Sequence, residues 1–370
     1  MKLVIAEKPS VGRAYADVLG AKSKKENYYE GNGYLVSWCI GHLLGLAQPQ
    51  EYDETYARWR MKDLPICPTD WKYTAAPSTK KQLKVLVDLI KRPDVTKIIN
   101  GADAGREGEL IMRLVYEHAK SNKPIQRLWV SSLEESALRH GFNNLRPGSD
   151  YDSLYQAAKC RQQADWLVGL NFTRLYSVLY NAQLRVGRVQ TPTLAMVVER
   201  YEKISSFVKE PFFVVQLKGA GFTAERERLS DRGMAGEKAD KCQGQTAVIQ
   251  QVKKQEKSVS PPRLYDLTTL QREANKLLGL TAAKTLETVQ TLYERKFVTY
   301  PRTDSKFITG DMAHGIDGLV DMAHNILAKT NANYGGSANA PVPNVRLIID
   351  NGKVSDHHAI LPTCRQASRI

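Results

Sequence analysis

The sequence predicts a multi-domain protein: an N-terminal α/β domain, then a helical segment, a β segment and a second, mostly helical region. Apolar strand-like runs alternate with helical patterns over the first 130 or so residues, which favours an α/β domain with a mainly parallel sheet. A helical pattern rich in Arg and Gln runs from Tyr151 to about Tyr201. Strand-like patterns then occupy residues 211–230 and 244–254, with a polar connection between them.

The first elements are short and clearly bounded. "KLVIA" (2–6) is a buried strand, and Ser10 is a candidate N-cap for a helix that stops at Gly20. Residues 34–46 predict another strand followed by a turn through Gly41.

A further buried strand covers residues 95–103, and a helix follows it in "REGELIMRLVYEHAK". The spacing places five side chains on one apolar stripe of this helix: Leu110, Ile111, Leu114, Val115 and His118.

The second half of the chain divides at Pro261-Pro262. Two helices follow, "LTTLQREANKLLG" and "AAKTLETVQTLYERK", and the second carries Leu286, Val289 and Tyr293 on a core face. These helices lead into a strand that contains Tyr300. Residues 332–345 predict a loop or linker.

The net charge indicates an anionic partner. The 370 residues include 53 Lys and Arg against 39 Asp and Glu, a formal charge of +14 and a pI near 9.4, which most often marks nucleic-acid binding. No apolar run approaches the roughly 20 residues that span a bilayer, and the N-terminus lacks the pattern of a signal peptide. Five cysteines without a CxxC pair argue against a zinc ribbon or a disulfide framework and suit a reducing cytoplasm.

Three acids follow predicted strands. Glu7 ends the first strand, and Asp103 and Glu107 follow the strand "KIIN". Because the carboxyl ends of parallel strands meet at one crevice, these carboxylates could share a Mg²⁺ ion. They could equally be surface acids near helix N-termini, where the helix dipole favours negative charge. The spacing alone leaves both interpretations open.

The segment "FVTYPRTDS" (297–305) holds a candidate nucleophile. A tyrosine before proline is usually a half-buried structural residue, and only about one free phenol in a thousand is ionised at neutral pH. Arg302 follows Tyr300 at the alternating position of an extended strand, so both side chains would point to one face. A guanidinium there could bind a phosphodiester and stabilise its developing charge.

Several long motifs together resemble the type IA DNA topoisomerases, most closely the topoisomerase III branch. "VIAEKPS" and "GADAGREGELI" are similar to the family's Toprim domain. Downstream, in the family's order, stand "CRQQADWLVGLNFTR", "VGRVQTPTLAMVVER", "LQREANKLLGLTAAKTLETVQTLYERKFVTYPRTDS" and "SDHHAILPT". The resemblance covers nearly the whole chain.

The resemblance implies a role for each residue of the acid and tyrosine motifs. Tyr300 forms a covalent 5′-phosphotyrosyl bond, Arg302 assists, Lys8 contacts the scissile phosphate, and His357 lies near the active site. Without the resemblance, His357 and His358 would be read as a structural pair that caps a turn. The implied Mg²⁺ ligands are Glu7, which is also catalytic, Asp103 and Glu107.

One position departs from the family's frequent Asp-x-Asp-x-Glu pattern. Gly105 stands where a middle carboxylate is common, which implies fewer protein ligands for the metal rather than an inactive protein.

The resemblance also implies that the stretch Val186 to Thr191 holds single-stranded DNA without reading its sequence. The candidate DNA-binding residues are Arg60, Arg161, Arg174, Arg185, Val186, Gly187, Arg188, Val189, Gln190 and Thr191. Arg161 and Asp165 stand one helical turn apart and could pair with each other instead.

The implied architecture has four parts. A Toprim α/β domain covers 1–150, a helical DNA-binding segment 151–208, a β-arch segment 209–264, and a helical, winged-helix-like domain with the tyrosine 265–370. The expected protein is a monomeric, cytoplasmic, nucleoid-associated enzyme that acts on single-stranded or negatively supercoiled DNA, with room for a helicase partner and no membrane. "GLTAAKT" lacks the glycine that a P-loop has before its lysine, so no ATP site is predicted.

Two alternatives remain open at this point. Relatives continue past "HHAILPT" with segments that return through the β arch, so this chain could be a truncated form that binds and cleaves DNA without relaxing it. A Toprim nuclease or primase would also depend on Mg²⁺ but would leave no tyrosine-linked DNA.

Overall fold

A computed structural model describes residues 1–219, 221–330, 344–354 and 357–363. The chain forms two compact units. The first joins Met1–Val186 to Pro262–Ile370, and the second is Gly187–Pro261. The boundary that Pro261-Pro262 predicts therefore coincides with the end of the second unit.

A seven-stranded sheet forms the centre of the first unit, in the order β2-β3-β4-β1-β7-β8-β9. The inner strands β4, β1, β7 and β8 are parallel, whereas both edges pair antiparallel. The sheet is thus mixed rather than mainly parallel, because short hairpin strands extend the parallel centre at each side. Its strands are β1 (Lys2–Ala6), β2 (Ser23–Lys24), β3 (Tyr28–Gly31), β4 (Tyr34–Trp38), β7 (Lys97–Gly101), β8 (Ile125–Arg127) and β9 (Arg146–Pro147).

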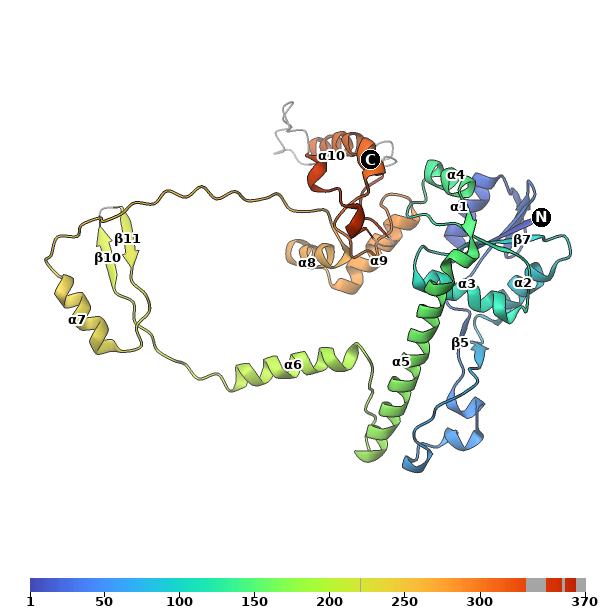
Figure 1. Ribbon diagram of the computed structural model, residues 1–370, viewed down its shortest axis with the longest axis horizontal. Helices are drawn as coiled ribbons and strands as arrows, with labels where there is room; N and C mark the ends of the chain where they lie inside the picture. The colour runs from blue at the N-terminus through green and yellow to red at the C-terminus, as the bar shows by residue number, and fades with distance from the viewer. Residues whose placement is uncertain (220, 331–343, 355–356, 364–370) are drawn as a thin grey trace. The chain divides into compact units, whose positions relative to one another are not determined.

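Helices cover both faces of this sheet, as the alternation along β1 requires (Figure 1). Leu3 and Ile5 belong to one buried cluster with α2 (Lys80–Lys91) and α3 (Arg106–His118). Val4 and Ala6 belong to a second cluster with α1 (Pro9–Leu19) and α4 (Glu135–Asn143). The sheet is therefore the middle of three layers.

The helix after β1 begins two residues earlier than an N-cap at Ser10 predicts. Its first residue is Pro9, whose fixed φ suits the first helical turn, and Lys8 is the N-cap. The interpretation of Ser10 as N-cap is wrong, whereas the stop at Gly20 is confirmed by its left-handed φ of 74°. Gly41 also has the positive φ that the predicted turn requires.

On α3, four of the five predicted core residues are buried: Leu110, Ile111, Leu114 and Val115. His118 is exposed, and Ala119 is buried in its place. The drift of a 3.6-residue repeat brings the position after His118 onto the apolar stripe at the last turn.

The longest helix, α5 (Asp152–Leu179), packs its first turns on α3 and its later turns beside residues 47–72 (Figure 1). The Trp166 indole donates to the oxygen of Ala47 at 3.2 Å, and Asn171 forms hydrogen bonds with both the amide and the carbonyl of Ile66. The long connection 47–72, which joins β5 (Leu44–Leu46) to β6 (Tyr73–Ala75), is thus fixed to α5.

After the proline boundary, α8 (Leu267–Leu278) and α9 (Ala282–Glu294) form the expected helix pair, and α10 (Ile316–Thr330) follows. Val289 and Tyr293 are buried and Leu286 is half-buried, as predicted for a core face. The segment around Tyr300 is extended but irregular, with an isolated bridge between Val298 and Pro362, so the predicted strand is wrong. Most of the predicted loop 332–345 lies outside the described residues.

The second unit contains α6 (Gln190–Ser205), the hairpin β10 (Gln216–Gly219) and β11 (Phe222–Glu225), and α7 (Arg232–Cys242). The predicted polar connection 231–243 is largely this helix, which Asp231 caps by accepting from the amide of Met234. Residues 244–254 form no strand, contrary to the prediction. No helix in the described part of either unit is long and apolar enough to cross a membrane.

Candidate active site

Two acids lie side by side where neighbouring strands end. β1 and β7 are parallel and pair Ala6 with Gly101, so Glu7 and Asp103 follow at the same edge of the sheet. The amide of Asp103 donates to Glu7 Oε2 at 3.2 Å. The predicted convergence of these two acids is present in the structure.

Burial and mutual repulsion disfavour the ionised form of both acids. Burial, and then the charge of Asp103, raises the pKa of Glu7 to about 7. Burial also raises the pKa of Asp103, although Lys8, whose Nζ lies 3.9 Å from Asp103 Oδ2, opposes the shift. The pair can therefore hold a proton at neutral pH.

The acid pair suits a hard cation. Asp103 Oδ2 is buried and has no hydrogen-bond partner, and a second carboxylate lies next to it. A divalent cation would relieve the repulsion, and Mg²⁺ accepts one or two carboxylates together with water. Glu7 and Asp103 are the residues that could hold it.

The third predicted ligand points elsewhere. Glu107 Oε2 lies 3.3 Å from Nε2 of His42, and that contact, together with Arg161 and Arg106, lowers the pKa of Glu107. Among the described residues, no three His, Cys, Asp or Glu side chains are grouped closely enough to hold a metal ion. The structure therefore joins Glu7 to Asp103 but does not bring Glu107 to them.

The loop between Asp103 and Glu107 depends on two glycines. Gly105 has φ 153° and ψ 173°, a conformation that side chains rarely allow, which accounts for a glycine at this position. Gly108 lies so close to the oxygen of Asp103 that a Cβ would stand 2.1 Å from it. Both glycines let the acid loop fold tightly against the first turn of α3.

Tyr300 faces the acid pair. Its phenol and the Asp103 carboxyl lie close enough to shift each other's pKa, and its amide donates to the oxygen of Ser131 at 3.3 Å. Its ring contacts Tyr293 edge-on, with centroids 5.4 Å apart. Burial, and then the charges of Asp103 and Glu7, raises the pKa of the Tyr300 phenol far above its usual value, so the hydroxyl is protonated in this arrangement.

Arg302 lies near the same three groups. Its charge lowers the pKa of Glu7, of Asp103 and of Tyr300, although the residue itself is exposed. The guanidinium is thus close enough to act on the phenol and remains accessible to an anion.

His357 completes the cluster. Its ring lies 4.2 Å from that of Tyr300, it interacts with the backbone of Ala104, and its buried Nδ1 has no hydrogen-bond partner. Burial lowers the pKa of His357 to about 4, so the imidazole is neutral at pH 7. The structure thus gathers Glu7, Lys8, Asp103, Tyr300, Arg302 and His357 at one place.

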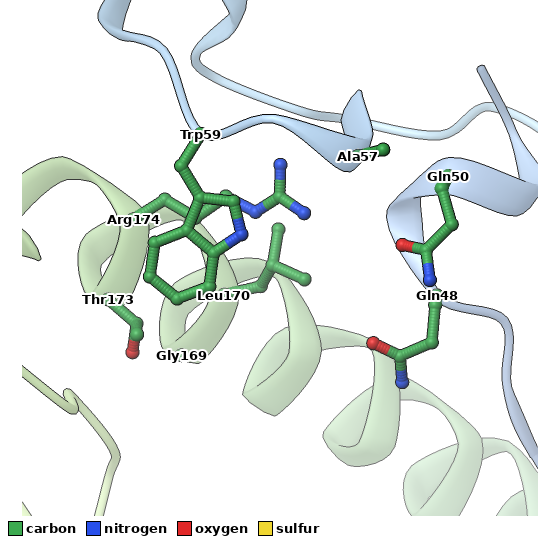
Figure 2. A pocket seen from close by; sticks show the side chains of 8 residues that line it. All are labelled: Gln48, Gln50, Ala57, Trp59, Gly169, Leu170, Thr173 and Arg174. Atoms are coloured by element: carbon green, nitrogen blue, oxygen red, sulfur yellow. The ribbon is translucent and has the colours of Figure 1, made fainter. Parts of the chain in front are cut away.

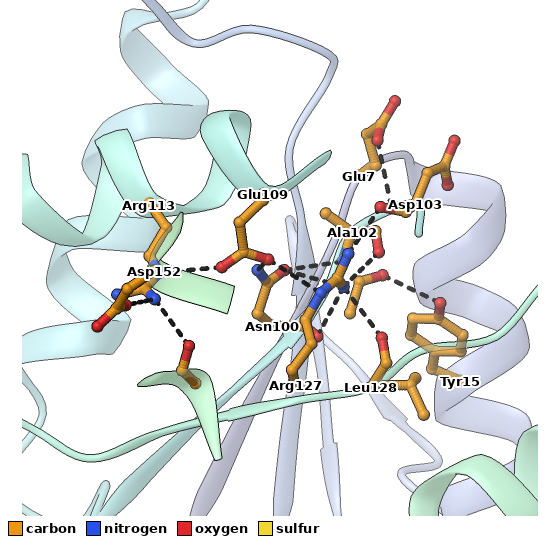
Figure 3. A network of polar contacts seen from close by, with 12 residues as sticks. Glu7, Tyr15, Asn100, Ala102, Asp103, Glu109, Arg113, Arg127, Leu128 and Asp152 are labelled. Carbon is orange, nitrogen blue, oxygen red and sulfur yellow. Dashed lines mark hydrogen bonds and ion pairs between the residues drawn. The ribbon is translucent and has the colours of Figure 1, made fainter. Parts of the chain in front are cut away.

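Sequence reasoning missed the buried network behind the acids (Figure 3). Arg127 is fully buried, and its Nε lies 3.0 Å from Glu109 Oε2. Its other nitrogens donate to the main-chain oxygens of Ala102 and Asp103. Asn100 donates to the same carboxylate of Glu109. The available signal was an arginine directly before the apolar residues Leu128, Trp129 and Val130.

The predicted DNA-binding arginines of the first unit have different environments. Arg161 Nε lies 4.0 Å from Asp165 Oδ2, so the alternative of an intrahelical pair is realised in the structure. Arg60 pairs with Asp63 at 2.7 Å. Arg185 is exposed, and no hydrogen bond or ion pair of its side chain is present among the described residues.

Arg174 is buried at the side of a pocket of about 430 Å³ (Figure 2). Its guanidinium donates to the oxygen of Tyr56 and lies 5.4 Å from the ring centre of Trp59. The lining residues are Gln48, Gln50, Ala57, Trp59, Gly169, Leu170, Thr173 and Arg174. Arg174 therefore lines a pocket beside α5 and is not a freely exposed cation.

The stretch 186–191 spans the junction of the two units. Val186 is fixed to α5, because its amide donates to the hydroxyl of Thr173 at 2.9 Å. Gly187, Arg188 and Val189 lead into α6, which begins at Gln190, and the amide of Gly187 donates to the hydroxyl of Thr191 at 3.0 Å. Val186 and Gly187 are half-buried and the residues from Arg188 to Thr191 are exposed. The DNA-binding role of this stretch stays a prediction.

Comparisons with known proteins complete the description. Residues 149–369 match the family model described as DNA topoisomerase, and residues 2–133 match that of the Toprim domain. DNA topoisomerase 3 of Bacillus subtilis (strain 168) is 41% identical over 370 residues, which cover 98% of this chain and 50% of that protein. The protein of the same name from Bacillus licheniformis is 42% identical over 376 residues, with the same shares.

Among solved structures, full-length topoisomerase I from Thermotoga maritima superimposes with a TM-score of 0.63 at 23% identity, over 98% of this chain and 55% of that one. That likeness shows the shared fold. The chain spans about half the length of the curated relatives it matches.

Proposed function

The chain belongs to the type IA DNA topoisomerases, on the topoisomerase III branch, and from this membership we propose that it breaks and rejoins one DNA strand through Tyr300. The observation that carries the proposal is the contact of the Tyr300 hydroxyl with Asp103, inside a cluster that contains both acids and cations. A phenol at the meeting point of a Toprim domain and a topoisomerase segment is suited to phosphodiester exchange.

In the proposed reaction, the phenol oxygen attacks the phosphorus of one strand. A bond forms between Tyr300 and the 5′ phosphate and the bond to the 3′ oxygen breaks, while the phenol proton passes to water and the 3′ oxygen takes a proton from Glu7. The released 3′ hydroxyl later attacks the phosphotyrosine and restores the strand. The number of phosphoester bonds is unchanged at each step, so no ATP is required.

The cations around Tyr300 would stabilise the charge that develops on the phosphate. Arg302 is exposed and already lowers the pKa of the phenol, so it can bind the phosphate and favour the attacking phenolate. Lys8, beside Asp103, would approach the phosphate from the Toprim side.

Glu7 is suited to proton transfer. With no cation bound, its pKa of about 7 allows it to carry a proton at neutral pH and to give it to the leaving 3′ oxygen. His357, neutral at pH 7, would position the ring of Tyr300 and offer its free Nδ1 to the phosphate or its water.

The proposal includes Mg²⁺, which a Toprim domain typically binds. Glu7 and Asp103 would hold the ion, with Glu107 as a further ligand through water, and the ion would supply positive charge near the 3′ side of the break.

The proposed substrate is DNA with unpaired stretches, single-stranded or negatively supercoiled. Arg185 and the stretch Val186 to Thr191 would hold its backbone, with Arg161 and Arg174 along α5 and Arg60 nearby. A cytoplasmic, nucleoid-associated location, a monomeric state, a winged-helix-like tyrosine domain and a helicase partner also belong to the proposal.

The nuclease or primase alternative is less favoured, because the topoisomerase family match lies outside the Toprim domain, over 149–369. A form that cleaves DNA without relaxing it is separated by experiment. Plasmid relaxation would be measured beside cleavage of a labelled single-stranded oligonucleotide, with the covalent product trapped by detergent. Relaxation with trapped adducts supports the proposal, and adducts without relaxation support the cleaving form. A wild-type chain that yields no adduct contradicts both.

A further inference from the structure

Arg127 is a buried charged residue that takes no part in the proposed chemistry. It lies at the end of β8, its side chain is fully buried, and its guanidinium is at the centre of the network behind the acids (Figure 3). We propose that Arg127 is a positioning residue, which fixes the main chain that presents Asp103 to Glu7 and Tyr300. The inference rests on the proposed function only for the roles of Asp103 and Tyr300.

The contacts of Arg127 are mostly with main-chain oxygens of the acid loop. Nη1 donates to the oxygen of Ala102 at 2.6 Å and to that of Asn100 at 3.1 Å, and Nη2 donates to the oxygen of Asp103 at 2.7 Å. A further bond at 3.0 Å reaches the oxygen of Leu128. One guanidinium thus binds one carbonyl near the end of β7 and two carbonyls of the segment that follows it, and so determines where the carboxyl of Asp103 points.

A planar guanidinium is required for this arrangement. Its donors diverge in one plane, whereas an ammonium is a single point with three donors and cannot reach the same set of oxygens. Without Arg127, buried carbonyls of the loop would lack partners, and the loop would have to turn outward to reach water. Asp103 would then leave its place beside Glu7.

The segment that follows Arg127 also contacts Tyr300. Four residues after Arg127, the oxygen of Ser131 accepts the amide of Tyr300. Between them, Leu128 and Val130 pack in the cluster that contains Tyr293 and Tyr300. The segment 127–131 therefore holds Asp103 through a side chain at one end and Tyr300 through its main chain at the other.

A simpler role would be to neutralise the equally buried Glu109, whose Oε2 lies 3.0 Å from Arg127 Nε and whose Oε1 also lies 2.9 Å from Arg113 Nε. The two roles differ in what a double substitution repairs. Replacing both members of a buried ion pair by apolar residues often leaves stability unchanged. It removes the need for neutralisation, but it does not restore the donors to the acid loop.

The experiment measures Mn²⁺ binding to the DNA-free chain by electron paramagnetic resonance, together with thermal unfolding. The variants are Arg127→Met, Arg127→Lys, Glu109→Gln and the double variant Arg127→Met with Glu109→Leu. Glu109→Gln is the matched control, because it removes the charge pair and leaves the main-chain contacts of Arg127 in place.

We expect the double variant to unfold within a few degrees of the wild type and to bind Mn²⁺ about 10- to 100-fold more weakly, the usual effect of losing a group that orients a ligand. Arg127→Lys should fall between the two, and Glu109→Gln should bind within about threefold of the wild type despite a lower melting temperature. A double variant with wild-type Mn²⁺ affinity would overturn the inference. So would a wild type that binds no Mn²⁺.

Failure of the proposed function would look different. The wild type would then form no covalent DNA adduct, while the order of Mn²⁺ affinities among the variants would be unchanged.

Discussion

The ring of Tyr300 lies against the imidazole of His357, with centroids 4.2 Å apart and planes inclined by 33°. The tyrosine comes from the segment after α9 and the histidine from a segment more than 50 residues later. On its other side, Tyr300 contacts Tyr293 and the carboxyl of Asp103. Tyr300 is therefore enclosed by separate segments around Asp103, Tyr293 and His357, and its burial keeps its hydroxyl protonated.

Substitution of Tyr300 by Phe should remove covalent chemistry and leave binding intact. Phenylalanine preserves the ring contacts and the hydrogen bond from the main-chain amide to Ser131, and it removes only the attacking oxygen. We expect no detergent-stable adduct with a labelled oligonucleotide, and an affinity for single-stranded DNA within about threefold of the wild type. Adducts that survive the substitution would show that another residue is the nucleophile.

The pKa of about 7 predicts how Glu7 affects stability with pH. Below pH 4.5 the carboxyl is protonated in both states and its burial carries no charge penalty. As the pH rises from 4.5 to 7, the unfolded state ionises first, so stability is lost, by about 3 kcal/mol in total. Glu7→Gln should not lose it. Urea unfolding at pH 4.5 and pH 8 measures this difference between the variant and the wild type, and an equal difference at both pH values would contradict it.

His357 should show the opposite dependence. Its pKa of about 4 lies below the usual 6.5, so its contribution is complete above pH 6.5 and is lost as the pH falls towards 4. Nuclear magnetic resonance titration of the imidazole in the folded chain should give a midpoint near pH 4. His357→Asn is the matched variant for unfolding experiments, because the Glu7 and His357 effects overlap in pH and partly cancel in the wild type. A midpoint near 6.5 would show that the ring is accessible to water.

Much of the site followed from the sequence because its residues stand at strand ends. The segments 2–6 and 95–103 were predicted as strands of one mainly parallel sheet, which allowed Glu7 and Asp103 to meet at one edge without requiring it, and the structure pairs the two strands directly. The packing of Tyr300 on that edge was expected only from the resemblance, because no local pattern specifies which distant segments meet.

Other features could not be predicted because tertiary contacts decide them. Glu107 follows the end of a strand, as expected for a metal ligand. In the structure its carboxylate instead contacts His42, which lies in a loop 65 residues earlier in the sequence. Arg127 resembles any charged residue that ends a strand until Glu109 and the carbonyls around it are known. The helix at 232–242 was missed because its side chains are polar on every side, with only Ala235 buried, and so show no apolar stripe.

Gly108→Ala should damage the acid loop. The added methyl group would meet the oxygen of Asp103 at 2.1 Å, and that oxygen is held from its other side by Arg127. We expect a loss of about 3 kcal/mol in the free energy of unfolding.

Gly318→Ala is the matched control, because this glycine is exposed on α10 with nothing near its missing Cβ. There alanine should stabilise the chain by about 0.5–1 kcal/mol. Calorimetry of both variants checks the pair, and equal effects would show that the close approach at Gly108 is not tight.

Binding to single-stranded DNA should weaken steeply with salt, because phosphate contacts release counterions. If Arg185 holds one phosphate, Arg185→Ala should reduce the slope of log K against log salt by about 0.7. Arg139→Ala is the control, because that exposed arginine is already paired with Glu135 on α4. Fluorescence anisotropy from 50 to 300 mM salt measures the slopes, and an unchanged slope for Arg185→Ala would remove it from the interface.

The hydrogen bond from the main-chain amide of Tyr300 to the oxygen of Ser131 has a practical consequence for chemical probing. Because this hydrogen bond joins two main-chain groups, it does not depend on the acidity of the Tyr300 ring. A genetically encoded series of fluorinated tyrosines at position 300 would therefore occupy nearly the same site while the phenol becomes progressively more acidic. The dependence of the cleavage rate on that acidity would report how much negative charge the oxygen carries when the DNA strand breaks.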